Sequence, residues 1–422
     1  MWEPNPKSPG NTPQVAPGSY SHHFSSANIP FGIASSFVHD RPQAVTRVKD
    51  VVIFLNLLAE DGFFSQVEGL PPGVFALDTL NDFAALPRTV HRQVRSTLQA
   101  ALGATGDPSC FPLYAVAVVS MVTMHMPVRV GDFADFSCSE AHVSNAGRIA
   151  GQRDLPKAFY SHPIGYQGRA SSIVISGTSI PRPKGHFSPD RIVTTFGPST
   201  AVDYELEFAA IIGKPLPWGE QVNIAEVEGH VFGYVLLNDW SARDIQVFEM
   251  PPLGPFIGKN FGTSISPWVV TPDALGSFRT RGPYNPYRPR ENHLEASLLS
   301  TYDIRMRVEI IVGGTRTVTC ETNVAELYWT LLQAIVHLTS AGCGLRTGDI
   351  VATGTVSSAV QFGCLLESTN GGRAPITLND GTQRCYLEDG DIVELSATAG
   401  GSGESGVGFG NCLGQIVASK GV

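Results

Sequence analysis

Two glutamates, Glu205 and Glu207, stand at the start of an otherwise apolar segment. Side chains alternate across a β-strand, so a strand here would point both carboxylates to one face and Leu206 to the other. Neighbouring carboxylates repel each other, and burying them is costly unless a cation compensates their charge. Mg²⁺ and Ca²⁺ prefer oxygen ligands and could supply that charge. The tripeptide alone favours a plainer interpretation, in which both glutamates face solvent from an edge strand.

A third carboxylate, Asp239, ends the apolar run 235–237 and precedes Arg243 and Gln246. Taken alone, Asp239 is expected to cap a helix that begins near Trp240, which is a common role for aspartate. Its charged and amide neighbours favour a functional site instead, because sites are often assembled where strands end.

The segment 131–147 holds a further carboxylate, Asp135, and then His142 on an expected short helix. An isolated histidine more often has an ordinary structural role. A carboxylate and a titratable imidazole on one segment nevertheless suit general-base chemistry near neutral pH.

Two other charged residues are open to two interpretations. Lys259 is a lone cation among Gly, Pro and Phe, and is either a surface lysine or a partly buried electrostatic group. Glu367 follows two leucines, and is either an inward-facing acid at the end of a short strand or a surface charge.

Short apolar runs punctuated by 44 Gly and 30 Pro favour a turn-rich β protein that positions these residues. Strands are expected within 171–177, 204–213, 230–239, 302–314 and 391–400. A helix is expected over 323–340, with Asn323 as its N-cap and Gly342 after its end. The glycine-rich run 401–414 lacks a following GK[ST], so tight turns are expected there rather than a phosphate loop.

The N-terminal quarter has a different pattern. Residues 1–26 are expected to be extended or disordered, because the first 20 are rich in Pro, Ser and Gly. A first module follows over 27–126, with strand or buried core at 50–62 and helices within 79–102. A larger, mostly β domain follows over 127–422, with a long polar loop at 283–293.

Composition excludes several classes of protein. The net charge of −9 argues against a general nucleic-acid or anionic-membrane binder. The apolar run 113–124 is too short for a span of about 20 residues. No signal peptide is evident, and seven cysteines without regular spacing favour reduced thiols, so a soluble cytoplasmic protein is expected.

Taken together, these segments resemble the fumarylacetoacetase family of carbon–carbon bond hydrolases. The most specific blocks are NDWSARDIQ (238–246) and LGPFIGKNFGTS (253–264), and the similarity runs from NIPFG (28–32) to GVGFGNCLG (406–414). The resemblance implies a mostly β fold with some α: a small SH3-like β-barrel N-terminal domain and a larger mixed β-sandwich or β-roll catalytic domain. It also implies a homodimer.

The resemblance assigns a role to each candidate residue. The acidic ligands of a Ca²⁺ or Mg²⁺ ion match Asp135, Glu205, Glu207 and Asp239. The general base matches His142, and the acid that orients it matches Glu367. The oxyanion-stabilising groups match Arg243, Gln246 and Lys259. A second Mg²⁺ site is associated with Asp239, Lys259 and Thr263, where a lysine ammonium cannot itself be a ligand.

The substrate contacts depart from the family pattern. Two substrate tyrosines of the family are replaced by Ser137 and Met250, whereas Tyr166, Gln246 and Thr355 match. The loop after His142 is shorter, so the substrate arginine aligns with either Arg148 or Arg153.

The resemblance implies hydrolysis of fumarylacetoacetate, a small diketo acid, to fumarate and acetoacetate in tyrosine and phenylalanine catabolism. A 1,3-diketone can bind a divalent ion through two oxygens, which polarises a carbonyl for attack by water that His142 deprotonates. Two alternatives stay open: hydrolysis or decarboxylation of another β-diketone or β-keto acid, and a non-catalytic paralogue. The intact acids and His142 speak against the paralogue.

Overall fold

The computed structural model describes residues 20–189, 192–283, 292–295, 299–400 and 405–420. Most of the segment expected to be disordered, and most of the expected loop at 283–293, lie outside these ranges. From Tyr20 onward the chain packs on the body of the protein, through a 3₁₀ turn at Ser21–His23 and the fully buried Phe24.

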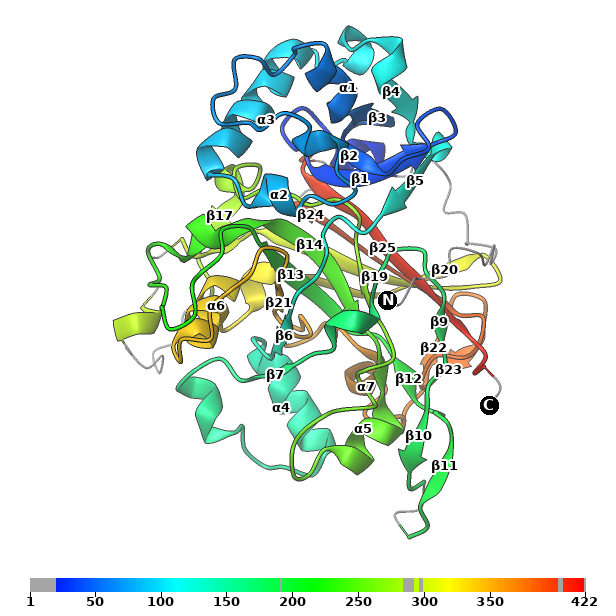
Figure 1. Cartoon of the computed structure of the whole chain (residues 1–422). Coiled ribbons are helices and arrows are strands. Elements are labelled where there is room, and N and C mark those ends of the chain that lie inside the picture. Colours follow the sequence, from blue (N-terminus) through cyan, green and yellow to red (C-terminus); the bar gives the residue numbers. More distant parts are fainter. Residues whose placement is uncertain (1–19, 190–191, 284–291, 296–298, 401–404, 421–422) are drawn as a thin grey trace.

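The N-terminal part is an antiparallel five-stranded sheet covered by helices (Figure 1). The strand order is β4-β3-β2-β1-β5. Its strands are β1 (Phe31–Ser36), β2 (Gln43–Val48), β3 (Val51–Phe54), β4 (Val116–Val118) and β5 (Val122–His125). Its helices are α1 (Leu55–Glu60), α2 (Asn81–Ala84) and α3 (Arg88–Leu102). The helices expected within 79–102 are confirmed, and the apolar stripe of α3 is buried at Val90, Val94, Leu98 and Leu102.

A seven-stranded mixed sheet forms the centre of the larger part, in the order β7-β6-β21-β13-β14-β16-β8. Its strands are β6 (Phe133–Phe136), β7 (Gly165–Gln167), β8 (Ile173–Ile175), β13 (Leu206–Ile212), β14 (Val231–Asp239), β16 (Thr263–Ile265) and β21 (Ile350–Ala352). The central strands β13 and β14 are buried along their whole length. The expected strands over 204–213 and 230–239 are therefore confirmed, but as central rather than edge strands.

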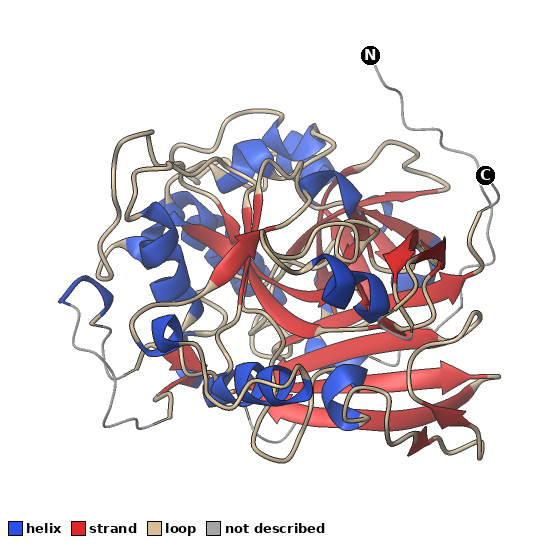
Figure 2. Ribbon diagram, turned by 90° about the horizontal axis from the view of Figure 1, so that it is seen from below, coloured by secondary structure: helices blue, strands red, loops and turns tan. Residues whose placement is uncertain are grey.

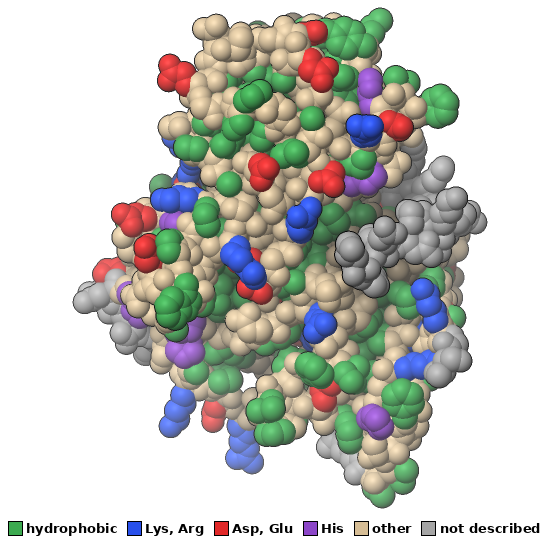
Figure 3. Space-filling model, viewed as in Figure 1, with side chains coloured by type: hydrophobic (Ala, Val, Ile, Leu, Met, Phe, Trp, Pro, Cys, Tyr) green, Lys and Arg blue, Asp and Glu red, His purple; other side chains and the backbone are tan. Residues whose placement is uncertain are grey.

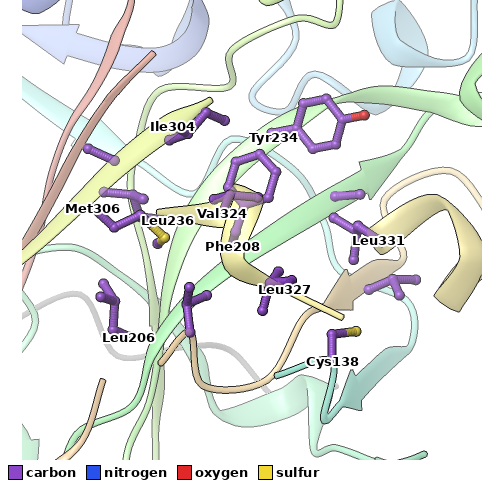
Figure 4. Packing of buried hydrophobic residues seen from close by; sticks show 14 of the residues in the cluster. Cys138, Leu206, Phe208, Tyr234, Leu236, Ile304, Met306, Val324, Leu327 and Leu331 are labelled. Atoms are coloured by element: carbon purple, nitrogen blue, oxygen red, sulfur yellow. The ribbon is translucent and has the colours of Figure 1, made fainter. Parts of the chain in front are cut away.

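A second five-stranded sheet, in the order β20-β19-β24-β25-β9, packs against the seven-stranded sheet. Its strands are β9 (Ile180–Pro181), β19 (Ile304–Val312), β20 (Thr315–Asn323), β24 (Ile392–Ala399) and β25 (Gly408–Val417). Figure 4 shows Phe208 and Leu236 of the seven-stranded sheet packed near Ile304 and Met306 of this five-stranded sheet. This shared core fixes the strands whose opposite faces carry the acidic residues.

Short strand pairs and helices complete the larger part (Figure 2). The pairs are β10 (Lys184–Phe187) with β11 (Thr195–Pro198), β12 (Val202–Asp203) with β15 (Ser241–Ala242), β17 (Arg279–Thr280) with β18 (Thr301–Tyr302), and β22 (Ile376–Thr377) with β23 (Gln383–Arg384). The helices are α4 (Glu140–Ile149), α5 (Arg243–Glu249), α6 (Leu331–Thr339) and α7 (Leu365–Ser368). Helices α4, α5 and α7 gather at the end of the molecule away from the N-terminal sheet (Figure 1).

Two sequence expectations are corrected. The helix expected over 323–340 begins only at Leu331, where Thr330 and Gln333 form a capping box. Asn323 instead ends β20 and caps a 3₁₀ turn at Val324–Glu326.

The glycine-rich run 401–414, expected to form turns, enters strand β25 at Gly408. Its glycines allow close packing, because a Cβ at Gly408 would lie 2.3 Å from the ring of His23 and one at Gly414 would lie 2.4 Å from the ring of Trp240.

Acidic, basic and hydrophobic side chains are interspersed on the face shown in Figure 3. Within the described ranges, no helix has both the length and the apolar character needed to cross a membrane.

Candidate active site

Four buried carboxylates meet where strands of the central sheet run side by side. Each offers an oxygen atom within 4.8 Å of the others, and the four residues are Asp135, Glu205, Glu207 and Asp239. Antiparallel pairing of β13 with β14 sets Leu206 opposite Asn238, and parallel pairing of β21 with β6 brings Asp135 to the same place. The sheet thus joins acids that the sequence keeps far apart.

The alternation expected for the two glutamates is confirmed. Tyr204, Leu206 and Phe208 pack into the core between the sheets, whereas Glu205 and Glu207 belong to the acidic cluster. The solvent-facing interpretation is wrong, because Glu205 is 5% exposed and Glu207 is fully buried.

The capping role considered for Asp239 is also wrong. Asp239 is the last residue of β14, and α5 begins only at Arg243 with Ala242 as its N-cap. The Asp239 carboxylate instead accepts hydrogen bonds from Tyr166 Oη at 2.6 Å and from Thr263 Oγ1 at 3.0 Å.

Lys259 is buried beside this cluster and is not a surface lysine. Its ammonium group pairs with Glu205, and lies 2.5 Å from Asp239 Oδ2. Burial disfavours the charged ammonium, but Asp239 and Glu205 outweigh this and raise the pKa of Lys259 above its ordinary value. Burial likewise opposes the charge of Glu205, yet Lys259 and Arg243 hold its pKa well below the ordinary range. Lys259 and Glu205 are therefore both charged.

The remaining acids lack such compensation. Asp135 Oδ1 and both carboxylate oxygens of Glu207 are buried without a hydrogen-bond partner in the described part of the chain. Burial, together with the neighbouring carboxylates, raises the pKa of both residues well above the ordinary range. Unpaired buried carboxylate oxygens that converge on one point are the donor set of a hard divalent cation, so these residues fit such an ion.

His142 and Glu367 form a second unit next to the acids. Ser139 caps α4 by accepting a hydrogen bond from the backbone N–H of His142, and the Nδ1 atom of His142 lies 2.8 Å from Glu367 Oε2. Glu367 lies on α7 with a fully buried side chain, so the surface interpretation is wrong and its element is a helix rather than a strand end. It also accepts hydrogen bonds from Asn145 Nδ2 at 2.9 Å and Ser357 Oγ at 2.7 Å.

The electrostatics of this pair suit a base held by an acid. Burial opposes the charge of Glu367, but His142 and the hydrogen bonds to the carboxylate lower its pKa to about 2. Burial also disfavours protonated His142, yet Glu367 outweighs it and raises the pKa of the imidazole above its ordinary value. An ionised Glu367 keeps the proton of a neutral imidazole on Nδ1, which leaves Nε2 free to accept a proton.

Arg243 is anchored on Glu205 of the acidic cluster and on a further acid, Asp203. Its Nη1 donates to Glu205 Oε1 at 2.8 Å and to Gln246 Oε1 at 3.1 Å, and its Nε donates to Asp203 Oδ2 at 2.9 Å. The sequence reasoning missed Asp203, although it stands two residues before Glu205 and so continues the same alternation. Asn145 and Ser357 were missed as well, and no local pattern marks them.

The residues expected to contact substrate differ in their burial and in their hydrogen bonds. Tyr166 reaches Asp239, and Thr355 is buried with its hydroxyl unpaired among the described residues. Ser137 follows β6 and is partly exposed, and Met250 is the C-cap residue of α5 and is 44% exposed.

The two candidate arginines are both exposed. Arg148 lies on α4 and donates to Asn145 Oδ1, which connects it to Glu367, whereas Arg153 lies in the segment after α4.

Known proteins match this chain over nearly its whole length. Residues 132–416 match the family model described as fumarylacetoacetate (FAA) hydrolase C-terminal, and residues 27–127 match the one described as fumarylacetoacetase N-terminal. Fumarylacetoacetase fahA of Aspergillus fumigatus is 44% identical over 418 residues, which cover 93% of this chain and 96% of that protein. Fumarylacetoacetase of Arabidopsis thaliana is 39% identical over 409 residues, covering 94% and 96%. A solved fumarylacetoacetate hydrolase structure from psychrophilic Exiguobacterium antarcticum shares the fold, with a TM-score of 0.51 and 17% identity over 92% of this chain and 99% of that chain.

Proposed function

The chain belongs to the fumarylacetoacetase family, and on this basis we propose that it hydrolyses fumarylacetoacetate to fumarate and acetoacetate in tyrosine and phenylalanine catabolism. The observation that carries the proposal is the four-carboxylate cluster together with the His142–Glu367 pair, whose charges interact through Glu205 and His142. A non-catalytic copy would have no reason to retain four mutually repelling buried acids beside a supported imidazole.

A divalent ion, Ca²⁺ or Mg²⁺, is proposed as the cofactor. Asp135, Glu205, Glu207 and Asp239 would hold it through their carboxylate oxygens. When bound, the ion balances the acids and polarises the carbonyl oxygens of a diketone. Lys259 and Thr263 act here by holding Asp239, since the ammonium of Lys259 is a donor and cannot be a ligand.

His142 is proposed as the general base. With Nδ1–H held by Glu367, Nε2 accepts a proton from water as the water oxygen forms a bond to the substrate carbonyl carbon. The carbon–carbon bond then breaks, and its electron pair leaves on the acetoacetate carbon, where the adjacent carbonyl delocalises it as an enolate. His142 returns its proton to that carbon.

Arg243, Gln246 and Lys259 are proposed to stabilise the oxyanion formed in the addition step. Arg243 and Lys259 are both buried, both cationic and both anchored on Glu205, so neither needs to reorganise when the charge develops. Each such donor is typically worth about 10²–10³ in kcat.

Substrate contacts are proposed for Tyr166, Thr355, Gln246 and Arg148, with Ser137 and Met250 at positions where the family has tyrosines. The short Ser137 and the exposed, apolar Met250 favour one second candidate, hydrolysis or decarboxylation of another β-diketone or β-keto acid.

We also propose an SH3-like barrel over 27–126, a catalytic domain over 127–422, a homodimer and a cytoplasmic location. The five-stranded sheet of the N-terminal part is compatible with the first of these.

Product analysis tests the proposed function. The full-length protein with Mg²⁺ or Ca²⁺ should convert fumarylacetoacetate to fumarate and acetoacetate in equal amounts, as followed by NMR. A panel of other β-diketones and β-keto acids is assayed alongside. Turnover of a panel member with none of fumarylacetoacetate would overturn the proposed substrate and support the second candidate.

A further inference from the structure

We infer that Asp203 is a positioning residue for the proposed reaction, because one buried carboxylate holds both Arg243 and the helical turn that carries Glu367. The inference rests on the proposed function and deepens it. It assigns a role to a residue that touches neither the acidic cluster nor the substrate.

The first half of this role concerns Arg243. Strand β12 pairs with β15 so that Asp203 lies opposite Ser241, two residues before Arg243. Nε of Arg243 donates to Asp203 Oδ2 at 2.9 Å, and Nη2 lies 2.9 Å from the same oxygen as an ion-pair contact without a hydrogen bond. Nη1 donates to Glu205 and Gln246. Asp203 therefore fixes the plane of the guanidinium and, with it, the direction in which Nη1 points.

The second half concerns α7. The backbone N–H groups of Leu365 and Leu366 donate to Asp203 Oδ1 and Oδ2 at 2.7 and 2.8 Å. Cys364, the N-cap residue, makes no side-chain capping bond, so Asp203 supplies the cap from a distant part of the chain. Glu367 is the next residue of this four-residue helix, and its carboxylate orients His142.

Oδ2 of Asp203 is the atom that joins the two halves, since it accepts from both Arg243 and Leu366. An asparagine at this position has one accepting oxygen and a donating NH₂ group. If the NH₂ group takes the Oδ1 position it faces the N–H of Leu365, and if it takes the Oδ2 position it faces the donors of Leu366 and Arg243. In either orientation at least one hydrogen bond to α7 is lost, and so is the charge that pairs with Arg243.

A second buried pair in the chain provides a matched control. Arg384 donates to Asp391 through Nε at 2.8 Å and Nη2 at 3.1 Å, and the backbone N–H of Glu388 also donates to Asp391. Asp391 is 2% exposed, as a purely structural counterpart of Asp203 should be, and its partners are not residues of the site.

The test compares Asp203→Asn and Asp391→Asn in the full-length, metal-loaded protein. Asp203→Asn should lower kcat for fumarylacetoacetate by about 10²-fold or more while KM changes only a few-fold, because oxyanion stabilisation and base orientation act in the transition state. Asp391→Asn should lower Tm and leave kcat within a few-fold of wild type. Equal kcat values for folded Asp203→Asn and wild type, or equal losses for the two variants, would overturn the inference.

A substrate-free readout separates this inference from the proposed function. In Asp203→Asn the pKa of the His142 imidazole, measured by NMR, should fall because Glu367 loses its position, and in Asp391→Asn it should not change. Failure of wild type to turn over fumarylacetoacetate would refute the proposed substrate alone, and an unchanged His142 pKa in Asp203→Asn would refute the inference alone.

Should Asp203→Asn fail to fold, Asp203→Glu retains the negative charge but is one methylene longer, so it cannot keep both connections. A wild-type kcat and His142 pKa in Asp203→Glu would then contradict the inference, and a fall in both would support it.

Discussion

The Nδ1 atom of His142 lies 2.8 Å from Oε2 of Glu367, although 225 positions separate the two residues in the chain. Helix α4 presents the imidazole and α7 presents the carboxylate, whose side chain is fully buried. The partly exposed ring is thus held by a rigid acid.

Replacing His142 tests whether this imidazole is the base. His142→Ala should lower kcat by about 10²–10⁴-fold, because proton transfer loses its acceptor, while divalent-ion affinity measured by calorimetry stays within a few-fold of wild type. His162→Ala, at a partly exposed histidine packed on His337, is the control and should keep full activity. An unchanged rate in His142→Ala would remove the residue from its role.

The pH dependence follows from the raised pKa of His142. His142 acts as a base only when its imidazole is neutral. Burial lowers the pKa of the imidazole, but Glu367 outweighs burial and raises it above the ordinary 6.5. The value of kcat should therefore fall as the pH drops through that higher pKa. In Glu367→Gln the raising charge is gone while burial remains. The acidic limb of the kcat–pH profile should move to lower pH, and kcat on the plateau should also fall. A limb that stays in place would show that Glu367 does not set the pKa of the base.

Replacing Glu207 should affect the Tm of the protein differently in the presence and in the absence of the divalent ion. Both of its oxygens are buried and unpaired within the described structure, and burial with the neighbouring acids raises its pKa. Glu207→Gln removes a carboxyl group whose ionisation is unfavourable there, so it should leave the metal-free Tm unchanged or raised. Saturating Mg²⁺ or Ca²⁺ should raise the Tm of wild type, because an ion at 100 times its Kd adds about 2.7 kcal/mol to the free energy of unfolding. Glu207→Gln should abolish this rise. Glu220→Gln, at an exposed glutamate, should behave as wild type in both. Retained stabilisation by the ion in Glu207→Gln would place the ion elsewhere.

The substrate contacts can be probed by restoring the family's phenols. Ser137→Tyr and Met250→Tyr should each lower KM for fumarylacetoacetate by about 2–10-fold through one added hydrogen bond, with kcat little changed. Leu253→Tyr, at a side chain 97% exposed, should not lower KM. A rise in KM in both restored variants, together with turnover of another diketone, would favour the second candidate substrate.

Local pattern predicted much of this site. Alternation along β13 put Glu205 and Glu207 on one face and their apolar neighbours in the core, and the spacing of α3 gave its buried stripe. Asp239 was harder to predict, because an aspartate after an apolar run equally suits a helix cap and only the hydrogen bonds from Tyr166 and Thr263 decide between the two.

Other features depend on contacts between distant segments. Asp203 caps α7 across 162 positions and Asn145 supports Glu367 across 222, so no short window of the sequence contains these relationships. Ser357 lies only 10 positions from Glu367, but no local pattern marks their hydrogen bond. The late start of α6 was missed for a local reason, because the capping box of Thr330 and Gln333 competes with Asn323 for the same helix.

The most direct test of the account is reversible metal dependence of fumarylacetoacetate hydrolysis. The purified protein is stripped with a chelator, assayed by loss of the diketone absorbance, and assayed again after Mg²⁺ or Ca²⁺ is restored in excess. The account predicts that turnover disappears on stripping and returns with the ion in wild type, and that it does not return in Glu207→Gln. Full turnover by the stripped wild-type protein would contradict it.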